Sequence, residues 1–249
     1  MLAVFKREFK SYFSTPIGYI VLAAFYFFLG LYFFIIYSGG MPNVEMAIIA
    51  MSTVVIFTLP VLTMRLMSED RRQKVDQALL TAPVKLSGVV LGKFFAAFAV
   101  YALGFAPTVI FEIIIGTKVS VNILTYLYAL LGVLLLGGAL IAIGMFISSL
   151  TESSVISAIL TMLVNIVVLY MSSFASMITP PTDSTGFFGK IWEKIVTFIV
   201  DLLERTAFVG VFEKFGESIF SVVDVVYFLS IITVFIFLSV RSLEKRRWS

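Results

Sequence analysis

Cysteine and histidine are both absent from this 249-residue chain. Their absence excludes disulfides, iron–sulfur and haem ligation by these residues, ordinary zinc sites, and Ser-His or Cys-His nucleophile pairs. Charged residues are also scarce, at 13% where a soluble domain usually has about 25%, whereas 60% of the residues are hydrophobic. Because so few polar side chains cannot cover a globule in water, the composition predicts a membrane protein. It predicts no catalytic, cofactor-binding or metal site.

Six apolar stretches are long enough to cross a membrane as helices. A bilayer core of about 30 Å needs roughly 20 apolar residues in a helix. The predicted spans are 17–37, 46–65, 90–113, 124–147, 155–178 and 222–240. The first span has a basic flank like that of a signal peptide, but it is long for one and lacks a clear cleavage site, so we expect it to be retained. With no evident repeat, the predicted fold class is an all-α polytopic membrane protein with a single transmembrane domain over residues 1–249.

Lysine and arginine are distributed unequally between alternate loops. One side of the predicted membrane carries 13 of these residues and the other carries 5. The richer side holds Lys6, Arg7, Lys10, Arg65, Arg71, Arg72, Lys74, Lys85, Lys93, Arg241, Lys245, Arg246 and Arg247. Because basic loops stay in the cytoplasm, both termini are predicted to be cytoplasmic in a cell membrane. The basic balance therefore needs no nucleic-acid partner.

Residues 1–15 are predicted to form an amphipathic helix in the cytoplasmic interface. Its apolar positions are Leu2, Phe5, Phe9 and Phe13, and its basic positions are Lys6, Arg7 and Lys10. We expect Phe5, Lys6, Arg7 and Phe9 to anchor it. The alternative is a lever beside a cytoplasmic partner.

The cytoplasmic loop 66–89 carries the most informative pattern. Its residues Glu69–Leu80 predict a helix with charges on one side and an apolar ridge on another, followed by a break at Pro83. Such a ridge suits insertion into a partner's groove, whereas a loop resting on lipid headgroups would explain only the basic residues. The predicted docking residues are Glu69, Asp70, Arg71, Arg72, Val75, Asp76, Leu79, Leu80, Thr81 and Pro83.

The run Gly88–Lys93 superficially resembles a phosphate-binding loop. A Walker A loop needs four residues between its glycines and Ser or Thr after the lysine, but here three residues separate Gly88 from Gly92 and Phe94 follows Lys93. Any ATP used with this chain must therefore be hydrolysed by another chain.

Two further connections have alternative interpretations. In the turn between the fourth and fifth spans, Ser149 and Glu152 fit a capping box, which would serve a tight reversal of the chain. The alternative is that this turn makes a contact near a symmetry axis. The outer loop 179–221 is predicted to hold short interfacial or re-entrant helices, which either pack in the interface or form an outer gate. The gate residues would be Trp192, Ile195, Ile199 and Leu202.

Ionisable residues are nearly absent from the spans. Arg65 and Glu112 lie at span ends, from which their side chains are expected to reach the interface. Ion-coupled carriers usually keep acidic groups at mid-depth, so this distribution favours energy supplied from outside the lipid.

Several motifs resemble the ABC-2 family of permeases, in particular its gliding-motility and nitrous-oxide-operon branch. They are Phe5–Glu8, Ser14–Ile17, Pro60–Arg65, Ser68–Arg72, Leu79–Val84, Leu91–Lys93, Ile143–Gly144, Ser148–Glu152, Tyr227–Ser230 and Glu244–Trp248. The resemblance implies an interfacial N-terminal helix, six spans, a coupling helix over Glu69–Thr81 and outer helices between spans five and six. It also implies two permease copies, cytoplasmic ABC ATPase subunits that bind ATP and Mg²⁺ and, as in many members, an extracytoplasmic auxiliary subunit. The permease itself would hold no cofactor.

The predicted function is that of a permease subunit of an ABC transporter, of the exporter type, coupled to ATP hydrolysis by a separate subunit. The alternative is a non-transporting membrane scaffold that transmits the ATPase's conformational change to an extracytoplasmic partner. An intramembrane enzyme is disfavoured because the chain lacks His, Cys and a buried acidic pair. A passive channel is disfavoured because no span carries an evident polar stripe.

Overall fold

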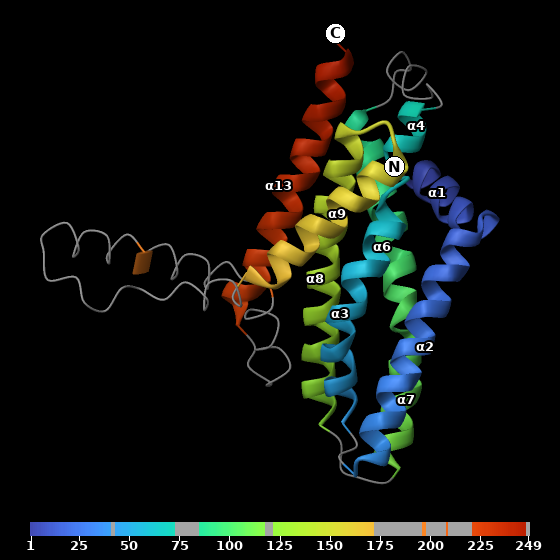
Figure 1. Ribbon diagram of the computed structural model, residues 1–249, viewed down its shortest axis with the longest axis vertical. Helices are drawn as coiled ribbons and strands as arrows, with labels where there is room; N and C mark the ends of the chain where they lie inside the picture. Colours follow the sequence, from blue (N-terminus) through green and yellow to red (C-terminus); the bar gives the residue numbers. More distant parts are fainter. Residues whose placement is uncertain are drawn as a thin grey trace, which may run out of the picture.

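The computed structural model describes residues 1–40, 43–72, 85–117, 122–171, 196–197, 208 and 221–247, and these are helical apart from short connections (Figure 1). The helices are α1 (Leu2–Ser14), α2 (Pro16–Ser38), α3 (Val44–Thr63), α4 (Ser68–Arg72), α6 (Leu86–Gly104), α7 (Ala106–Gly116), α8 (Ile123–Leu150), α9 (Ser154–Leu169) and α13 (Val222–Arg247). No strand occurs in these ranges, which confirms the predicted all-α fold class.

Five helical segments are long and apolar enough to cross a membrane. They are Pro16–Ser38, Val44–Arg72, Leu86–Gly116, Ile123–Leu150 and Val222–Lys245. The sixth, α9, is apolar but has 16 residues over Ser154–Leu169. The remainder of the predicted span 155–178, from residue 172 on, lies outside the described residues, so the sixth span stays a prediction.

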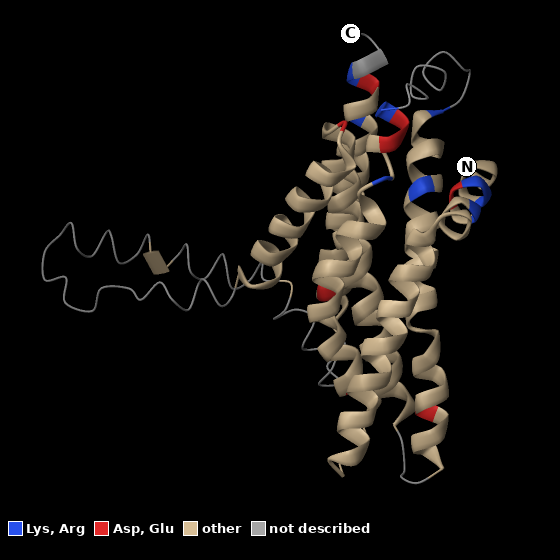
Figure 2. Cartoon of the chain, turned by 45° about the vertical axis from the view of Figure 1, so that its right-hand side comes forward, with Lys and Arg blue, Asp and Glu red and all other residues tan. Residues whose placement is uncertain are grey.

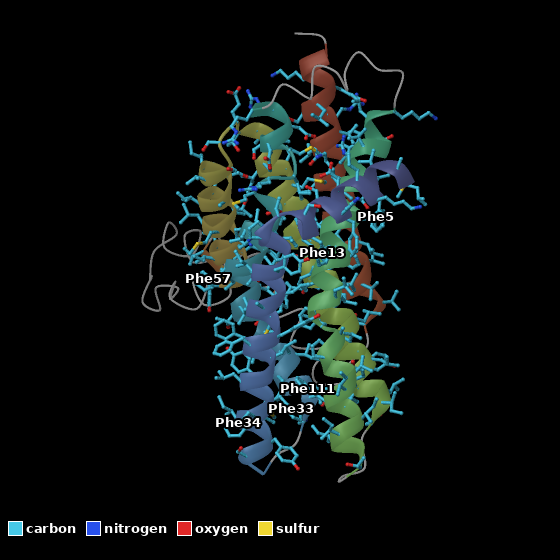
Figure 3. All side chains as sticks on the ribbon, turned by 90° about the vertical axis from the view of Figure 1, so that its right-hand side faces the viewer. Phe5, Phe13, Phe33, Phe34, Phe57 and Phe111 are labelled. Atoms are coloured by element: carbon cyan, nitrogen blue, oxygen red, sulfur yellow. The ribbon has the colours of Figure 1, made fainter. Side chains whose placement is uncertain are left out.

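The third predicted span is two helices rather than one. α6 ends at Gly104, and α7 begins at Ala106 with Pro107 in its first turn. Proline has no N–H to donate and its ring clashes with the preceding turn, which explains the break before it. In the middle of α7, Phe111 stacks on Phe33 of α2 with the ring centroids 4.2 Å apart (Figure 3).

The helix α8 forms the centre of the bundle. Of its most apolar stretch, 67% is buried, whereas the corresponding value is 17% for both α2 and α13. It contacts α3, α6, α9 and α13. Two glycines allow close approach: a Cβ atom at Gly137 would lie 2.1 Å from the ring of Tyr101, and one at Gly144 would lie 2.4 Å from Oγ1 of Thr63. The core therefore depends on small residues along α8 as well as on apolar side chains.

Charged residues gather at one end of the bundle (Figure 2). This end, called the charged end below, contains α1, α4 and the C-terminal end of α13 (Figure 1). It corresponds to the side for which the distribution of lysine and arginine predicts a cytoplasmic location.

The environment of the Glu112 side chain differs from the predicted one. The sequence places it at a span end, from which it was expected to reach the interface. In the structure it lies in α7, and both carboxylate oxygens are buried without a hydrogen-bond partner among the described residues. The direction of α7 is set by the helical break at Phe105, and the sequence pattern does not reveal that direction.

Candidate coupling site

The helix α4 leaves α3 through a turn that is fixed by a serine of α8. Oγ of Ser148 accepts hydrogen bonds from the backbone N–H groups of Met67 and Ser68, each at 3.1 Å, and donates to the carbonyl oxygen of Met64 at 3.0 Å. Ser148 and Ser68 are fully buried. One hydroxyl group thereby satisfies the N–H groups of Met67 and Ser68 at the start of α4 and the carbonyl group of Met64 at the end of α3, which are groups of the kind that helix ends leave unpaired.

Arg71 joins α4 to the turn between α8 and α9. Its Nη1 atom donates to the carbonyl oxygen of Leu150 at 2.9 Å, and its Nη2 atom lies 2.7 Å from a carboxylate oxygen of Glu152. The carbonyl is one of those left unpaired at the C-terminus of α8, where a cation is favourable. A displacement of α4 is therefore transmitted directly to the α8–α9 turn.

The capping of this turn differs from the prediction. Ser153, rather than Ser149, is the N-cap of α9 and accepts from the N–H of Ile156 at 3.5 Å. Ser149 lies inside α8 and donates to the carbonyl oxygen of Phe146. The prediction failed because α8 continues to Leu150, so that Ser149 is still helical and Glu152 is left to pair with Arg71.

A buried ion cluster joins α4 to α1 and α6. Nζ of Lys93 lies 2.8 Å from a carboxylate oxygen of Asp70 and 3.2 Å from one of Glu8, and the lysine is 1% exposed. The same oxygen of Glu8 also accepts from Arg7 at 2.6 Å, and this hydrogen bond raises the pKa of Arg7. Three segments far apart in the sequence thus meet at a single ammonium group. We call Glu8, Asp70 and Lys93 the ion triad.

The helix α1 crosses the bundle at the charged end and packs on α6 and α2 (Figure 3). A Cβ atom at Gly92 would lie 2.9 Å from Cβ of Val4 and 3.0 Å from the carbonyl oxygen of Met1, so only glycine permits this crossing. The hydroxyl group of Tyr12 donates to the carbonyl oxygen of Leu62 at 2.9 Å, and burial raises the pKa of Tyr12. Gly92, the second glycine of the apparent phosphate-loop sequence, therefore serves the packing of α1 on α6.

The predicted anchor residues lie beside this contact face. Phe5 and Phe9 are half-buried and stacked, with ring centroids 5.7 Å apart, whereas Lys6 and Arg7 are exposed. Leu2, placed by the periodicity on the apolar face, is 69% exposed. Phe5 and Phe9 pack against the apolar core, and Val4, Glu8 and Tyr12 make further tertiary contacts of α1. The anchoring of α1 in lipid stays a prediction.

A cavity of about 310 Å³ lies between α1, α3, α4 and α6 at this junction. Its charged lining residues are Arg7, Glu8, Arg65, Glu69, Asp70 and Lys93. Three cations face three anions, and Arg65 lies 3.9 Å from Glu69. The balance of charge makes the cavity an internal polar junction rather than a binding site for an ion of one sign.

The structure describes only part of the predicted docking surface. Glu69, Asp70, Arg71 and Arg72 belong to α4, and Arg72 is exposed. The remaining predicted docking residues, Val75, Asp76, Leu79, Leu80, Thr81 and Pro83, lie outside the described residues. So do the predicted gate residues Trp192, Ile195, Ile199 and Leu202. Both sets of roles stay predictions.

The helix α4 is linked to two other parts of the chain, since Arg71 reaches the α8–α9 turn and Asp70 belongs to the ion triad. From the sequence, Glu8 and Ser148 were named only within motifs of the resemblance, and Lys93 was placed among the cytoplasmic basic residues and in the apparent phosphate loop. Lys93 did carry a signal, because a lysine inside the predicted span 90–113 requires a buried partner.

Comparison with known families gives one match. The family model described as "ABC-2 family transporter protein" matches residues 37–241, most of the chain's length. No curated protein sequence matches the chain significantly. The match includes four of the five membrane-capable segments in whole or for most of their length, together with α4 and the α8–α9 turn, and it begins at the last two residues of α2. The chain therefore belongs to the ABC-2 family of transporter membrane proteins.

Proposed function

We propose that this permease subunit couples ATP hydrolysis by a separate ABC ATPase to the export of a solute, and that the ATPase binds at α4 on the charged end. The main support for this proposal is that α4 is linked to two separate parts of the bundle: Arg71 binds the α8–α9 turn and Asp70 binds Lys93 of α6. An isolated cytoplasmic loop would need neither link. The excess of lysine and arginine in the loops of this end supports its placement in the cytoplasm.

The two arginines of α4 have different roles in this proposal. Arg71 is bound within the chain, to Leu150 and Glu152. Arg72 is exposed, and no ion pair among the described residues includes it. We therefore assign binding of the ATPase to Arg72 together with the predicted ridge of Val75 and Leu79, and transmission of its motion to Arg71.

The same proposal includes a second permease copy and ATP with Mg²⁺ held in the ATPase subunits. Movement of the bundle would open the exit at the predicted gate around Trp192 and Leu202. Membership of the gliding-motility branch and an extracytoplasmic auxiliary subunit are further parts of the proposal, which rest on the motif resemblance alone.

Arg72→Glu is expected to reduce the amount of ATPase that co-purifies with the chain tenfold or more, since like charges facing each other at an interface cost several kcal/mol. The measurement is affinity purification of the tagged chain from native membranes, with quantitation of the bound ATPase. The matched variant is the charge swap Arg71→Glu with Glu152→Arg, which preserves the internal ion pair and should retain the ATPase. Equal recovery from wild type and Arg72→Glu would refute the assignment of Arg72.

Reconstituted vesicles distinguish transport from the scaffold alternative. A permease moves solute across the vesicle membrane when ATP is hydrolysed, whereas a scaffold alters the activity of an extracytoplasmic partner and moves no solute. ATP hydrolysis without solute movement, in vesicles that contain all co-purifying subunits, would favour the scaffold.

A further inference from the structure

The buried face of α9 is polar, while its exposed face is apolar. Ser157, Thr161 and Asn165 are each 0% exposed. The hydroxyl oxygens of Ser157 and Thr161 and both amide atoms of Asn165 have no hydrogen-bond partner among the described residues. On the opposite face, Ile159 and Leu163 are each 55% exposed. The spacing of four residues places the three polar side chains in one row along the helix.

This row faces α3 and α8. A Cβ atom at Gly144 of α8 would lie 3.0 Å from Cγ2 of Thr161 and 2.4 Å from Oγ1 of Thr63, so the three helices are in close contact there. Thr63 donates its own hydroxyl proton to the carbonyl oxygen of Leu59 at 2.9 Å. We call this contact, with Ser157, Thr161 and Asn165 on its α9 side, the α9 seam.

A seam that stayed closed would be better filled by apolar side chains. A buried polar group without a partner destabilises the state in which it is buried, and an amide with neither atom bonded does so most. Alanine, valine and leucine would pack the same row without that cost. The unpaired groups are therefore explained by another state of the seam, in which they find partners.

We propose that the α9 seam opens during the transport cycle, and that Ser157, Thr161 and Asn165 then bind water and the uncharged hydrogen-bonding groups of the solute. The three side chains supply both donors and acceptors and no charge. They suit hydroxyl, amide or carbonyl groups. This proposal rests on the proposed function, since it identifies part of the solute's path.

The α9 seam begins at the α8–α9 turn, to which α4 is bound through Arg71. The row from Ser157 to Asn165 extends for about 12 Å along the helix, at about 1.5 Å per residue. Ser153 caps α9 at its mouth, and Arg71 binds Leu150 and Glu152 within the same turn. A movement of α4 therefore acts at the mouth of the seam.

Cysteine accessibility tests the opening, and the absence of native cysteine makes the wild-type chain a suitable background. Single variants Ser157→Cys and Asn165→Cys are compared with Leu163→Cys on the exposed apolar face. The chain with its co-purifying ATPase is reconstituted in vesicles and treated with a small, charged methanethiosulfonate reagent, without nucleotide, with ATP and with ATP plus vanadate. Because a thiol in apolar surroundings is mostly protonated and unreactive, fast labelling requires water at the site.

In at least one nucleotide state, Ser157→Cys and Asn165→Cys are expected to react tenfold or more faster than Leu163→Cys. Rates equal to that of Leu163→Cys in every state would overturn the proposal. If the ATPase is bound but the seam cysteines do not react, the proposed opening of the α9 seam is wrong and the proposed permease function is unaffected. Reactive seam cysteines without any bound ATPase would support the seam and contradict the proposed coupling.

A second variant keeps the test independent of the introduced cysteine. Asn165→Leu removes the unpaired amide and is expected to favour the closed seam. It should raise the unfolding temperature of the complex and slow the labelling of Ser157→Cys in the same chain tenfold or more. A lower unfolding temperature with unchanged labelling would show that Asn165 is bonded in the closed state and would contradict the proposal.

Discussion

Gly137→Ala is expected to destabilise the bundle more than any other alanine substitution of a glycine in α8. The new Cβ atom would lie 2.1–2.4 Å from the ring and hydroxyl atoms of Tyr101. Tyr101 is fully buried, and its hydroxyl group donates to the carbonyl oxygen of Val133 at 2.6 Å, so the ring has no free space into which to move. Overpacking costs about 1–3 kcal/mol and the lost hydrogen bond about 1 kcal/mol more.

A thermal unfolding curve of the purified chain measures this effect. At about 2–4 °C per kcal/mol for a chain of this size, the unfolding temperature should fall by roughly 4–16 °C. Gly30→Ala is the matched control, because no atom lies within 4 Å of a Cβ at that position. Tyr101→Leu in the Gly137→Ala chain should recover part of the loss. An unfolding temperature equal to that of Gly30→Ala would show that α6 and α8 do not approach as closely as described.

Lys93→Met is expected both to destabilise the charged end and to uncouple α1 from α4. The lysine is 1% exposed and holds both Glu8 and Asp70; without it, Asp70 loses this ion pair and Glu8 keeps only its contact with Arg7. Removing one partner of a buried ion pair costs about 3–5 kcal/mol. The side chains of Glu8 and Asp70 are 16% and 21% exposed, so partial hydration reduces the expected loss to roughly 2–4 kcal/mol.

A triple variant separates stability from coupling. In Lys93→Met with Glu8→Gln and Asp70→Asn, the uncompensated charges are gone, so most of the stability should return. The link between α1 and α4 is still broken, so the solute-dependent change in ATP hydrolysis should stay several-fold below wild type. Thermal unfolding and ATP hydrolysis in vesicles provide the two readouts. Normal coupling in the triple variant would show that the ion triad is structural only.

The apolar stretches could be predicted from the sequence because they depend on composition over some 20 residues at a time. Five of them are membrane-capable helices in the structure. The break at Phe105 was not predicted, although Pro107 follows it by two residues. An α-helix continues only while its backbone N–H groups donate to the preceding turn, and Pro107 has no N–H with which to do so.

The candidate site was predicted only where its signal was local. The charged start of α4, at Glu69–Arg72, follows from the order of residues in one loop. The ion triad does not, since Glu8 and Lys93 are 85 residues apart and meet only because α1 crosses α6 at Gly92. The polar row of α9 was missed for another reason. Its spacing of four residues is visible within the predicted span 155–178, which was interpreted as having no polar stripe. Only packing shows that the row is buried and that its groups have no partner among the described residues.

Site-specific photocrosslinking at position 72 tests the central claim, that an ATPase binds at α4, most directly. A photoreactive amino acid replaces Arg72 in one variant and Ser38, an exposed residue at the far end of α2, in the other. Both variants are irradiated in native membranes, and the adducts are identified by mass spectrometry. The account predicts an adduct with an ABC ATPase from position 72 and none from position 38. Absence of the ATPase from the position 72 adducts, or its presence in those from position 38, would contradict the account.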